Sequence, residues 1–426
     1  MTRESNFIAR FFYTLALWLL LPYIFLRLAW RARKQPEYLS HIGERFGFYS
    51  KRDLNDLPVI WLHAVSVGET RATASLVARL RAAYPDHRIL LTHTTPTGRA
   101  TGVQLYGDGV MRAYLPYDYP FAVRRFLRHF RPQLGILMET EIWFNLIHAS
   151  HAAQVPLLLL NARMSEKSAR GYARFARLTR GALQQLTGIA AQTAADVQRL
   201  QALGAPQVSV MGNLKFDIEP PQAMLELGKT LRERFGTARR VFLAASTREG
   251  EEALLLDAFQ QQAHDLLLVI VPRHPQRFDE VAGMLAERRL RFQRRSANEP
   301  VAADVQVVLG DSMGEMFAYY AAADLAFIGG SLLPFGGQNL IEACSVGTPV
   351  LIGPHTYNFT DATRMAVEAG AALRVNDAPE LLQTVQKLLG DVRALQAMGA
   401  QGLQFVAAHQ GATANAMAVI EQAQML

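Results

Sequence analysis

The stretch FIGGSLLPFGGQNLIEACSVGTPVLIGP, residues 327–354, is the part of the sequence that best indicates the fold. A strand-like run ends in Gly329-Gly330-Ser331, and the patterns GGxNxxE, GxPV and GP follow it in that order. Paired glycines directly after a strand let the backbone approach a ligand closely. A carboxylate such as Glu342 on the following helix can accept hydrogen bonds from a ribose diol. We therefore interpret this stretch as a nucleotide-sugar site beyond the end of a strand.

Short apolar runs alternate with longer amphipathic ones on both sides of this stretch. Alternation of this kind is typical of βαβ units and a parallel sheet. Around the opening stretch, strands are expected at Val241–Ala245, Leu266–Pro272, Val305–Leu309, Leu325–Ile328 and Pro349–Ile352. Helices intervene, and helix-forming sequence closes the chain from Pro379 to Leu426.

The same alternation fills the first half of the chain. Strands are expected there at Val59–Val65, Arg88–Thr94, Leu134–Glu139, Pro156–Ala162, Gly188–Gln192 and Val208–Met211. The helices between them are expected at Glu69–Tyr84, Pro120–Phe130, Glu166–Leu186 and Ala194–Leu203. Two prolines in Asp217–Gln222 indicate an interdomain linker. The sequence thus predicts an α/β protein with two Rossmann-like doubly wound domains, residues 35–217 and 218–426, that face a cleft.

The composition of the 426-residue chain excludes several classes of protein. Half of the residues are hydrophobic and 19% are charged, which excludes a disordered chain. The single Cys344 excludes a disulfide framework, a four-thiolate zinc site and a CxxC redox pair. The motifs GxxxxGK[ST], HExxH, GxSxG, GxGxxG and D-x-D are absent from the sequence, and its eleven histidines lack ligand-like spacing. We therefore expect neither a metal nor a cofactor.

The net charge differs between the two halves of the chain. Residues 1–217 hold 27 Lys and Arg against 14 Asp and Glu, a net charge of +13. Residues 218–426 hold 17 against 23, a net charge of −6. This asymmetry suggests that the first half meets a negatively charged partner, for which nucleic acid, anionic lipid and a phosphorylated substrate are candidates.

The N-terminus favours a lipid surface over nucleic acid. Phe11–Leu26 is a run of 16 residues without a charge, just short of the ~18 apolar residues of a confident spanning helix. Basic residues flank it, namely Arg10, Arg27, Arg31, Arg33 and Lys34. We interpret residues 1–34 as a membrane anchor, because no small-residue cleavage site of a signal peptide follows. The segment either spans, with the rest of the chain in the cytoplasm, or lies in the interface on anionic head groups. A buried helix of a soluble domain is the alternative.

The first predicted strand ends in HAVSVGET, residues 63–70. A carboxylate at this position, Glu69, lies at the mouth of the expected cleft, where a helix begins. Glu69 is either a general base or an acidic residue that complements the helix dipole in the first turn.

Two further polar segments follow predicted strands in the first half. METEIW, residues 138–143, places Glu139 and Glu141 directly after an apolar run, and structural and functional roles are equally open for them. Lys215 in NLKFD can neutralise a phosphate or a departing anion, although a lone lysine is most often solvated surface.

In the second half, polar residues again follow strands. Arg273 in VPRHP stands between prolines, which suits a fixed fork for phosphate or carboxylate. Residues 310–315, GDSMGE, are expected to open a helix whose free N–H groups can bind an anion. The Ser312-to-Glu315 spacing also matches a capping box, which is the structural alternative.

Taken together, these motifs resemble those of a known family. HAVSVGE, TPTG, YLPYD, METEIW, NAR, LKFD, VPRHP, GDSMGE and FIGGS…GGxNxxE…GP occur in that order. They resemble the 3-deoxy-D-manno-octulosonic acid (Kdo) transferases of Gram-negative bacteria, over a match that runs from about Arg31 to the C-terminus. The resemblance implies an inverting GT-B glycosyltransferase of the inner membrane with its catalytic body on the cytoplasmic side. It also implies CMP-Kdo as donor and the anionic, acylated, bisphosphorylated precursor of lipid A as acceptor.

The resemblance also implies roles for single residues. It makes Glu69 the general base and assigns Glu139 and Lys215 to stabilisation of the transition state. The positions that match CMP-binding residues are Pro272, Arg273, Met313, Gly314, Glu315, Asn339, Leu340, Ile341 and Glu342.

The chain departs from the family pattern at two places. It reads Glu141-Ile142-Trp143-Phe144-Asn145 where members commonly read ELWPN, and Gln338 stands where many have histidine. Another GT-B protein with a different donor, such as a nucleotide-GlcNAc epimerase or transferase, is the nearest alternative. A catalytically inert membrane-bound scaffold is an alternative of another class, although it would not need Glu69, Glu139 and Lys215 together.

Overall fold

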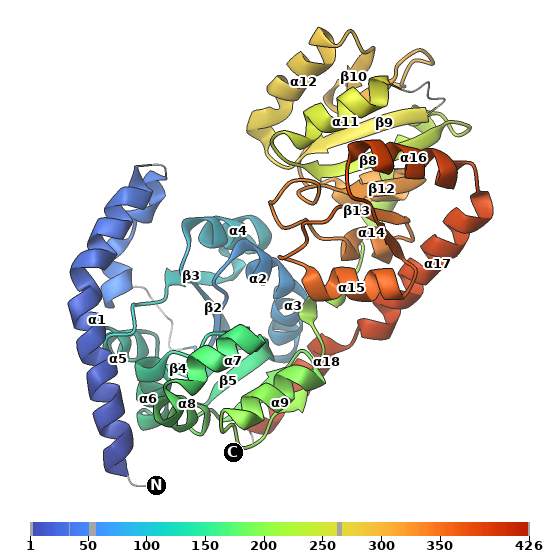
Figure 1. The fold of residues 1–426 in the computed structure, drawn as a ribbon. Coiled ribbons are helices and arrows are strands. Elements are labelled where there is room, and N and C mark those ends of the chain that lie inside the picture. Colours follow the sequence, from blue (N-terminus) through green and yellow to red (C-terminus); the bar gives the residue numbers. More distant parts are fainter. Residues whose placement is uncertain (1–2, 34, 51–56, 262–265, 425–426) are drawn as a thin grey trace. The chain divides into compact units, whose positions relative to one another are not determined.

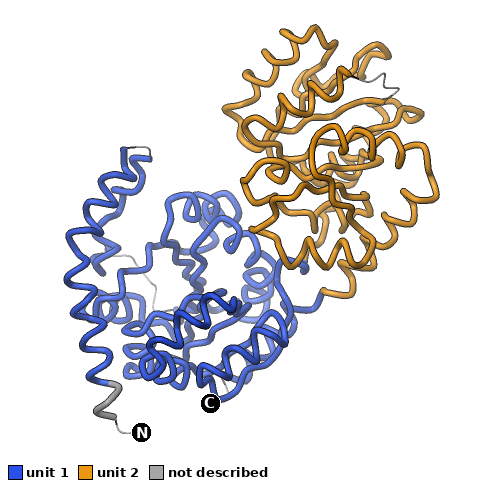
Figure 2. The backbone as a smooth tube through the Cα atoms, viewed as in Figure 1, with its two compact units in different colours: residues 1–217, 410–426 blue, residues 218–409 orange. Residues whose placement is uncertain are grey.

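The computed structural model describes residues 3–33, 35–50, 57–261 and 266–424. Lys34 and the outermost residues of the predicted anchor and of the C-terminal helix lie outside this part of the chain. Figure 2 shows the two compact units, which comprise residues 1–217 with 410–426 and residues 218–409. Each unit is built on one parallel sheet with helices on both faces (Figure 1), so the predicted α/β class with two doubly wound sheets is confirmed.

Within the described residues, the first sheet has seven strands in the order β3-β2-β1-β4-β5-β6-β7. All neighbouring pairs are parallel. Its strands are β1 (Val59–His63), β2 (Arg88–His93), β3 (Met111–Tyr114), β4 (Pro132–Met138), β5 (Leu157–Ala162), β6 (Gly188–Ala191) and β7 (Ser209–Val210). Its α-helices are α1 (Arg3–Ala32), α2 (Val67–Ala72), α3 (Ala74–Ala83), α4 (Pro96–Tyr106), α5 (Pro120–Phe130), α6 (Phe144–Ala152), α7 (Glu166–Ala173), α8 (Ala176–Leu183), α9 (Ala194–Ala202) and α18 (Ala412–Gln424). Short 3-10 turns are η1 (Pro36–Tyr38), η2 (Ile42–Phe46), η3 (Gly107–Gly109) and η4 (Leu214–Phe216).

The second sheet likewise has seven described strands, in the order β10-β11-β9-β8-β12-β13-β14. Its neighbouring pairs are also parallel. Its strands are β8 (Arg240–Thr247), β9 (Leu266–Pro272), β10 (Phe292–Arg294), β11 (Val307–Leu309), β12 (Leu325–Ile328), β13 (Val350–Ile352) and β14 (Ala372–Arg374). Its helices are α10 (Gln222–Phe235), α11 (Glu251–Gln260), α12 (Phe278–Glu287), α13 (Met316–Ala322), α14 (Ile341–Ser345), α15 (Thr360–Glu368), α16 (Ala378–Leu389) and α17 (Val392–His409), with 3-10 turns η5 (Pro275–Arg277) and η6 (Arg295–Ala297).

The sheets are buried on both faces, which explains why their central strands are continuous apolar runs. In β1, Val59 and Trp61 pack into one apolar cluster, while Ile60 and Leu62 pack into a second cluster. Successive side chains of a strand point to opposite faces, so the two clusters lie on the two faces of the first sheet.

The structure differs from the prediction in a few elements. Strands β3, β10 and β14 were not predicted. The predicted helix Glu69–Tyr84 is divided at Thr73, whose hydroxyl donates to the carbonyl of Thr70 at 2.8 Å. The predicted helix Glu166–Leu186 is likewise divided, between α7 and α8.

The C-terminal segment belongs to a different unit from the one predicted. We expected residues 218–426 to form the second domain, whereas residues 410–426 pack with the first unit. The carboxylate of Asp217 accepts hydrogen bonds from the N–H groups of Gly411, at 2.7 Å, and Thr413. Ile420 on α18 is fully buried in the same apolar cluster as Ile60, because α18 covers β5 and β6.

Helix α1 packs along the first unit with one of its faces. The Tyr13 hydroxyl donates to Asp118 Oδ2 at 2.9 Å, and the Tyr119 hydroxyl donates to the carbonyl of Leu17 at 2.7 Å. Further along the helix, Leu28 is buried. These contacts extend over four turns of α1, so the helix is a docked part of the unit.

The other face of α1 is exposed and apolar. Its large exposed side chains are Phe7, Ile8, Phe11, Phe12, Leu15, Leu19, Leu20, Tyr23, Leu26 and Trp30. By length and composition alone, the segment Phe7–Ala32 is long and apolar enough to cross a membrane.

Replacing Ile420 with alanine should destabilise the first unit, although the residue follows the second unit in sequence. Removing a fully buried isoleucine side chain costs about 2–5 kcal/mol of unfolding free energy. Hydrogen exchange at the amides of β5 and β6 should therefore accelerate. The exposed neighbour Gln422, replaced with alanine, is the control and should leave exchange unchanged. Equal exchange in both variants would contradict the packing described for α18.

Candidate functional site

Two predicted segments of the first unit meet where the strand order reverses. β1 and β4 are neighbours, but the chain continues from β1 to β2 on one side and from β4 to β5 on the other. Doubly wound sheets bind ligands beyond the carboxyl ends of strands at such a reversal. The loop after β1 carries Glu69, and the loop after β4 carries Glu139.

The carboxylate of Glu69 is held on both of its oxygens. Oε1 accepts a hydrogen bond from the Ser66 hydroxyl at 2.9 Å, and Oε2 accepts one from the Val65 N–H at 2.8 Å. Ser66 is also the N-cap of α2 and accepts from the N–H of Glu69 at 3.3 Å. Glu69 therefore takes part in capping the start of α2, which is the structural role considered for it. It also lies at the point between β1 and β4 where the strand order reverses.

The environment of Glu69 changes its acidity. Burial raises the pKa of Glu69 to about 7, and the nearby carboxylates of Glu139 and Glu141 also raise it. The hydrogen bonds from Val65 and Ser66 oppose this rise. A carboxyl group with a pKa near neutrality exchanges protons readily at physiological pH, which is the property of a general base.

Glu139 pairs with Lys215 next to Glu69. The distance from Lys215 Nζ to Glu139 Oε1 is 3.4 Å, and about a fifth of each side chain is exposed, 22% for Lys215 and 20% for Glu139. Glu139 has a positive φ of 59°, an unfavourable backbone conformation for a residue with a side chain. The structure thus brings together the three residues Glu69, Glu139 and Lys215, which lie far apart in the sequence.

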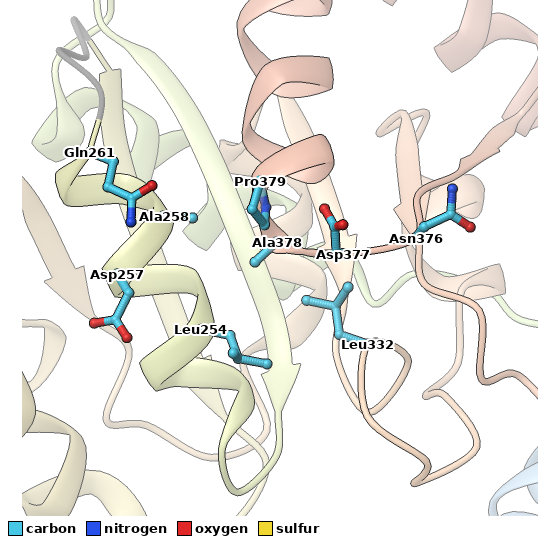
Figure 3. Close-up of a pocket in the computed structure, with 9 residues that line it drawn as sticks. All are labelled: Leu254, Asp257, Ala258, Gln261, Leu332, Asn376, Asp377, Ala378 and Pro379. Atoms are coloured by element: carbon cyan, nitrogen blue, oxygen red, sulfur yellow. The ribbon is translucent and has the colours of Figure 1, made fainter.

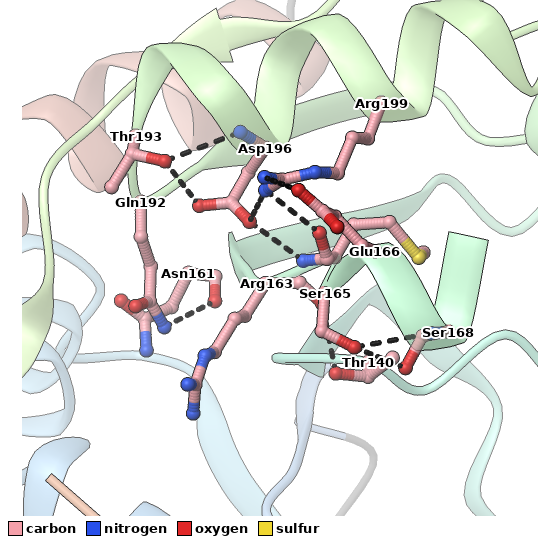
Figure 4. A network of polar contacts seen from close by, with 11 residues as sticks. Thr140, Asn161, Arg163, Ser165, Glu166, Ser168, Gln192, Thr193, Asp196 and Arg199 are labelled. Atoms are coloured by element: carbon pink, nitrogen blue, oxygen red, sulfur yellow. Dashed lines mark hydrogen bonds and ion pairs between the residues drawn. The ribbon is translucent and has the colours of Figure 1, made fainter. Parts of the chain in front are cut away.

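A network of side-chain amides holds the turn that carries Lys215. Asn161 Oδ1 accepts from the N–H of Leu214 at 3.1 Å, and Asn213 Oδ1 accepts from the N–H of Lys215 at 3.0 Å. Gln192 links the two asparagines, because its Nε2 donates to the Asn161 carbonyl at 3.0 Å and its Oε1 accepts from Asn213 Nδ2 at 3.0 Å. Figure 4 shows Gln192 beside Asn161. Asn161 and Gln192 were not predicted to have a role, although both are polar residues at the ends of strands.

Hydrogen bonds also tie the loop after β4 to the loop after β5 (Figure 4). The Thr140 hydroxyl donates to the carbonyl of Arg163 at 2.9 Å. Asp196 in the first turn of α9 accepts from the N–H of Met164 at 2.8 Å. The loop that carries Glu139 is therefore braced by its neighbour in the sheet.

The second unit has its own reversal point, between β8 and β12. Glu251, the first residue of α11, is fully buried there and accepts from three backbone N–H groups at 2.6–2.9 Å. These belong to Arg248, Gly330 and Leu332. This carboxylate joins the loop after β8 to the loop after β12. Neither Glu251 nor Arg248 was predicted to have a role.

The paired glycines after β12 serve two different purposes. A Cβ atom on Gly329 would lie 2.5 Å from the carbonyl oxygen of Ser246, so this glycine lets two backbone loops approach each other. Gly330 has a positive φ of 69°, which favours glycine for its backbone conformation. At Gly329 the close approach is therefore to the protein's own backbone.

The predicted CMP-binding segments emerge at one edge of the second sheet. Strands β11, β9, β8 and β12 are consecutive neighbours, so their carboxyl ends lie side by side. Pro272 and Arg273 lie at the end of β9, where the N–H of Arg273 donates to the Thr247 carbonyl at 2.9 Å. Residues 310–315 follow β11, and Asn339 to Glu342 follow the loop after β12.

Asn339 organises the start of α14. Its Oδ1 accepts from the N–H of Ile341 at 3.1 Å, and its Nδ2 donates to Glu342 Oε1 at 3.1 Å. Leu340 and Ile341 are buried, so they would contribute backbone groups rather than side chains to any ligand. The ribose contact of Glu342 stays a prediction.

The segment 310–315 leads into a helix, as predicted, but only its last residue, Glu315, takes part as the N-cap. Helix α13 begins only at Met316, because Gly314 has a positive φ of 81°. The Ser312 hydroxyl donates to Glu315 Oε2 at 2.7 Å, and Arg295 Nη2 lies 3.4 Å from Glu315 Oε1. The S-x-x-E pair thus braces a loop, and it does not form a capping box.

A small pocket of about 240 Å³ lies elsewhere on the second unit (Figure 3). It is lined by α11, the start of α16 and the loop after β12, through Leu254, Asp257, Ala258, Gln261, Leu332, Asn376, Asp377, Ala378 and Pro379. None of the residues predicted for the site lines it. In the described part of the chain, His, Cys, Asp and Glu form no cluster of three that could hold a metal ion.

Comparisons with known proteins identify the family. The family model of 3-deoxy-D-manno-octulosonic-acid transferases matches residues 40–218, and the model of glycosyl transferases group 1 matches residues 241–405. The chain is 45% identical over 425 residues to the 3-deoxy-D-manno-octulosonic acid transferase of Bordetella pertussis, covering 96% of this chain and 98% of that one. It is 37% identical over 409 residues to the enzyme of the same name from Haemophilus influenzae, covering 95% and 96%.

Solved structures agree with this fold. HepE from Anabaena in complex with UDP has a TM-score of 0.55 over 87% of this chain and 100% of its own, at 14% sequence identity. At that identity the likeness concerns the fold alone. The high identity to the B. pertussis and H. influenzae enzymes confirms the family that the motifs predicted. The chain belongs to the Kdo transferases, which are glycosyltransferases, and it has the GT-B fold.

Proposed function

We propose that this Kdo transferase moves Kdo from CMP-Kdo to the acylated, bisphosphorylated glucosamine disaccharide precursor of lipid A, with inversion at the anomeric carbon. The observation that carries the proposal is the Glu69 carboxyl group, whose pKa of about 7 suits a base at the reversal point of the first sheet. The B. pertussis and H. influenzae relatives, both named as Kdo transferases, support the identity of the sugar.

In the proposed reaction, an acceptor hydroxyl gives its proton to Glu69 while its oxygen forms a bond to the anomeric carbon of Kdo. The bond from that carbon to the phosphate oxygen of CMP breaks, and CMP leaves with the bonding electrons. Attack on the face opposite CMP inverts the anomeric centre. Because CMP is already a good leaving group, the main tasks of the enzyme are to position the acceptor and to remove its proton.

The Lys215–Glu139 pair and Arg273 are proposed to stabilise the charges that develop in the transition state and on the departing phosphate. The amide network holds the backbone turn that carries Lys215, and Lys215 pairs with Glu139, so these charges need little rearrangement as the transition state forms. Arg273 at the end of β9 would meet the departing phosphate. The nucleotide would be bound by Pro272, Arg273, Met313, Gly314, Glu315, Asn339, Leu340, Ile341 and Glu342.

The acceptor would reach the enzyme at a membrane surface. The outward face of α1 is apolar, with Leu19 75% and Leu26 70% exposed, and the exposed Arg27 and Arg33 follow. We propose that α1 lies in the plane of the cytoplasmic face of the inner membrane. A spanning helix would be surrounded by lipid, whereas the inner face of α1 is already packed against Asp118 and Tyr119. Together with the +13 charge of residues 1–217, this arrangement suits an anionic lipid acceptor.

Mass spectrometry of the lipid product tests the proposed reaction directly. The purified protein, incubated with CMP-Kdo and the bisphosphorylated acceptor, should increase the mass of the lipid by one or more Kdo units. Glu69→Gln should yield far less of this product in the same incubation time. A folded wild-type protein that accepts only other nucleotide sugars would contradict the proposed donor.

The transfer rate should rise with pH and level off above about 7, because Glu69 must be ionised to accept a proton. Glu139→Gln removes a neighbouring negative charge, so it should move the midpoint of this rise to lower pH. Glu69→Gln should remove this pH dependence and lower kcat by about 10²–10⁴-fold on the high-pH plateau, while CMP binding persists.

The exposed Glu166, replaced with glutamine, is the control and should leave the midpoint in place. A midpoint that is the same in wild type and Glu139→Gln would argue that another group is titrated.

Binding to anionic lipid vesicles tests the proposed orientation of α1. Leu19→Glu combined with Leu26→Glu places charges on the exposed apolar face and should strongly reduce cosedimentation with phosphatidylglycerol vesicles. Leu403→Glu on α17, also at an exposed leucine, should bind like the wild type. Undiminished binding of the double variant would show that another surface meets the membrane.

A further inference from the structure

Arg248, in the loop after β8, is an arginine that no part of the site described so far uses. Its guanidinium carbon lies 4.5 Å from the centre of the Phe335 ring. Its Nε atom is buried without a hydrogen-bond partner among the described residues. A guanidinium that lies over an aromatic ring is attracted to the face of the ring, which restricts its movement before any ligand arrives.

Both parts of this stacked pair are held in place. The N–H of Arg248 donates to the buried Glu251 at 2.9 Å. The carbonyl of Phe335 accepts from Asn358 Nδ2 at 3.0 Å, and the N–H of Gly337 in the same loop donates to the Gly330 carbonyl at 2.7 Å. The Arg248 guanidinium therefore lies over the Phe335 ring, and hydrogen bonds hold the backbones of both residues.

Gln338 approaches the same place. A Cβ atom built on Gly330 would lie 3.3 Å from Gln338 Nε2 and 3.5 Å from Arg248 Cγ. The side chains of Gln338 and Arg248 therefore both lie next to Gly330, where the strand order of the second sheet reverses, and the Gln338 amide can donate hydrogen bonds there. Arg273, at the end of the neighbouring strand β9, reaches the same edge of the sheet. Burial, and then the charges of Arg248 and Arg273, lower the pKa of the adjacent His274, so both arginines act on this place.

The donor has two anionic groups that residues at this edge of the sheet must bind. CMP-Kdo, the donor of the proposed function on which this inference rests, carries one negative charge on its phosphate and another on the carboxylate of its sugar. Arg273 suits the phosphate. We propose that Arg248, together with the Gln338 amide, binds the carboxylate of the donor sugar and so selects an acidic sugar. A planar guanidinium can bind a carboxylate with two parallel hydrogen bonds. Because Arg273 is assigned to the phosphate, the carboxylate is the second anionic group of the donor that Arg248 can bind.

Calorimetric titration of the full-length protein without acceptor separates the two anions, because CMP has the phosphate and lacks the carboxylate. Arg248→Ala should leave the Kd for CMP within twofold and raise the Kd for CMP-Kdo at least tenfold, which corresponds to about 1.4 kcal/mol. Arg248→Lys keeps the charge without the planar fork and should lie between wild type and Arg248→Ala. Gln338→Ala should weaken CMP-Kdo binding alone. The exposed Arg364, replaced with alanine, is the control and should bind both ligands like the wild type.

Each other result overturns the inference. An equal loss of CMP and CMP-Kdo binding in Arg248→Ala and Arg248→Lys would assign Arg248 to the phosphate. Unchanged binding of both ligands would leave Arg248 without a role in the donor site, while the proposed function would stand. A wild-type protein that binds neither ligand would overturn the proposed donor, and the inference would fall with it.

Discussion

All strands of a parallel sheet point the same way, so every loop that leaves a carboxyl end reaches the same edge, and this constraint underlies the whole site. In the first unit it brings the loops after β1 and β4 together, and with them the carboxylates of Glu69 and Glu139. Two carboxylates so close together raise the pKa of Glu69 beyond what burial alone would do. In the second unit the same constraint aligns the loops after four neighbouring strands, and Glu251 joins two of them with hydrogen bonds to their backbones. The sheets thus supply positions, and the loops supply the chemistry.

Much of the fold could be predicted from the sequence, because the central strands of both sheets are buried on both faces and read as apolar runs. The three strands that were missed, β3, β10 and β14, all lie at sheet edges and have three or four residues. An edge strand needs neither a long apolar run nor burial on both faces, so Phe292-Gln293-Arg294 leaves no clear pattern. The helix divided at Thr73 was also missed, because a side-chain hydrogen bond to the backbone leaves no periodic signal.

The residues of the site could be predicted from the sequence, but their burial, charge environment and contacts could not. Motifs pointed to Glu69, Glu139 and Lys215, yet the raised pKa of Glu69 depends on which charges surround it after folding. Glu251 lies among several polar residues after β8, and its burial alone distinguishes it from the exposed Glu249. Helix α1 is a similar case. Its hydropathy indicated a lipid partner, whereas its hydrogen bond to Asp118 joins residues 105 positions apart and could not be read from either segment.

The return of α18 to the first unit has a consequence for how the protein is made. The first unit lacks part of its cover over β5 and β6 until residues 412–424 have left the ribosome. The second unit, by contrast, is continuous from residue 218 to 409 and is complete earlier in synthesis. The first unit therefore begins before the second unit and is completed after it. Until α18 has been synthesised, one apolar face of the first sheet is only partly covered.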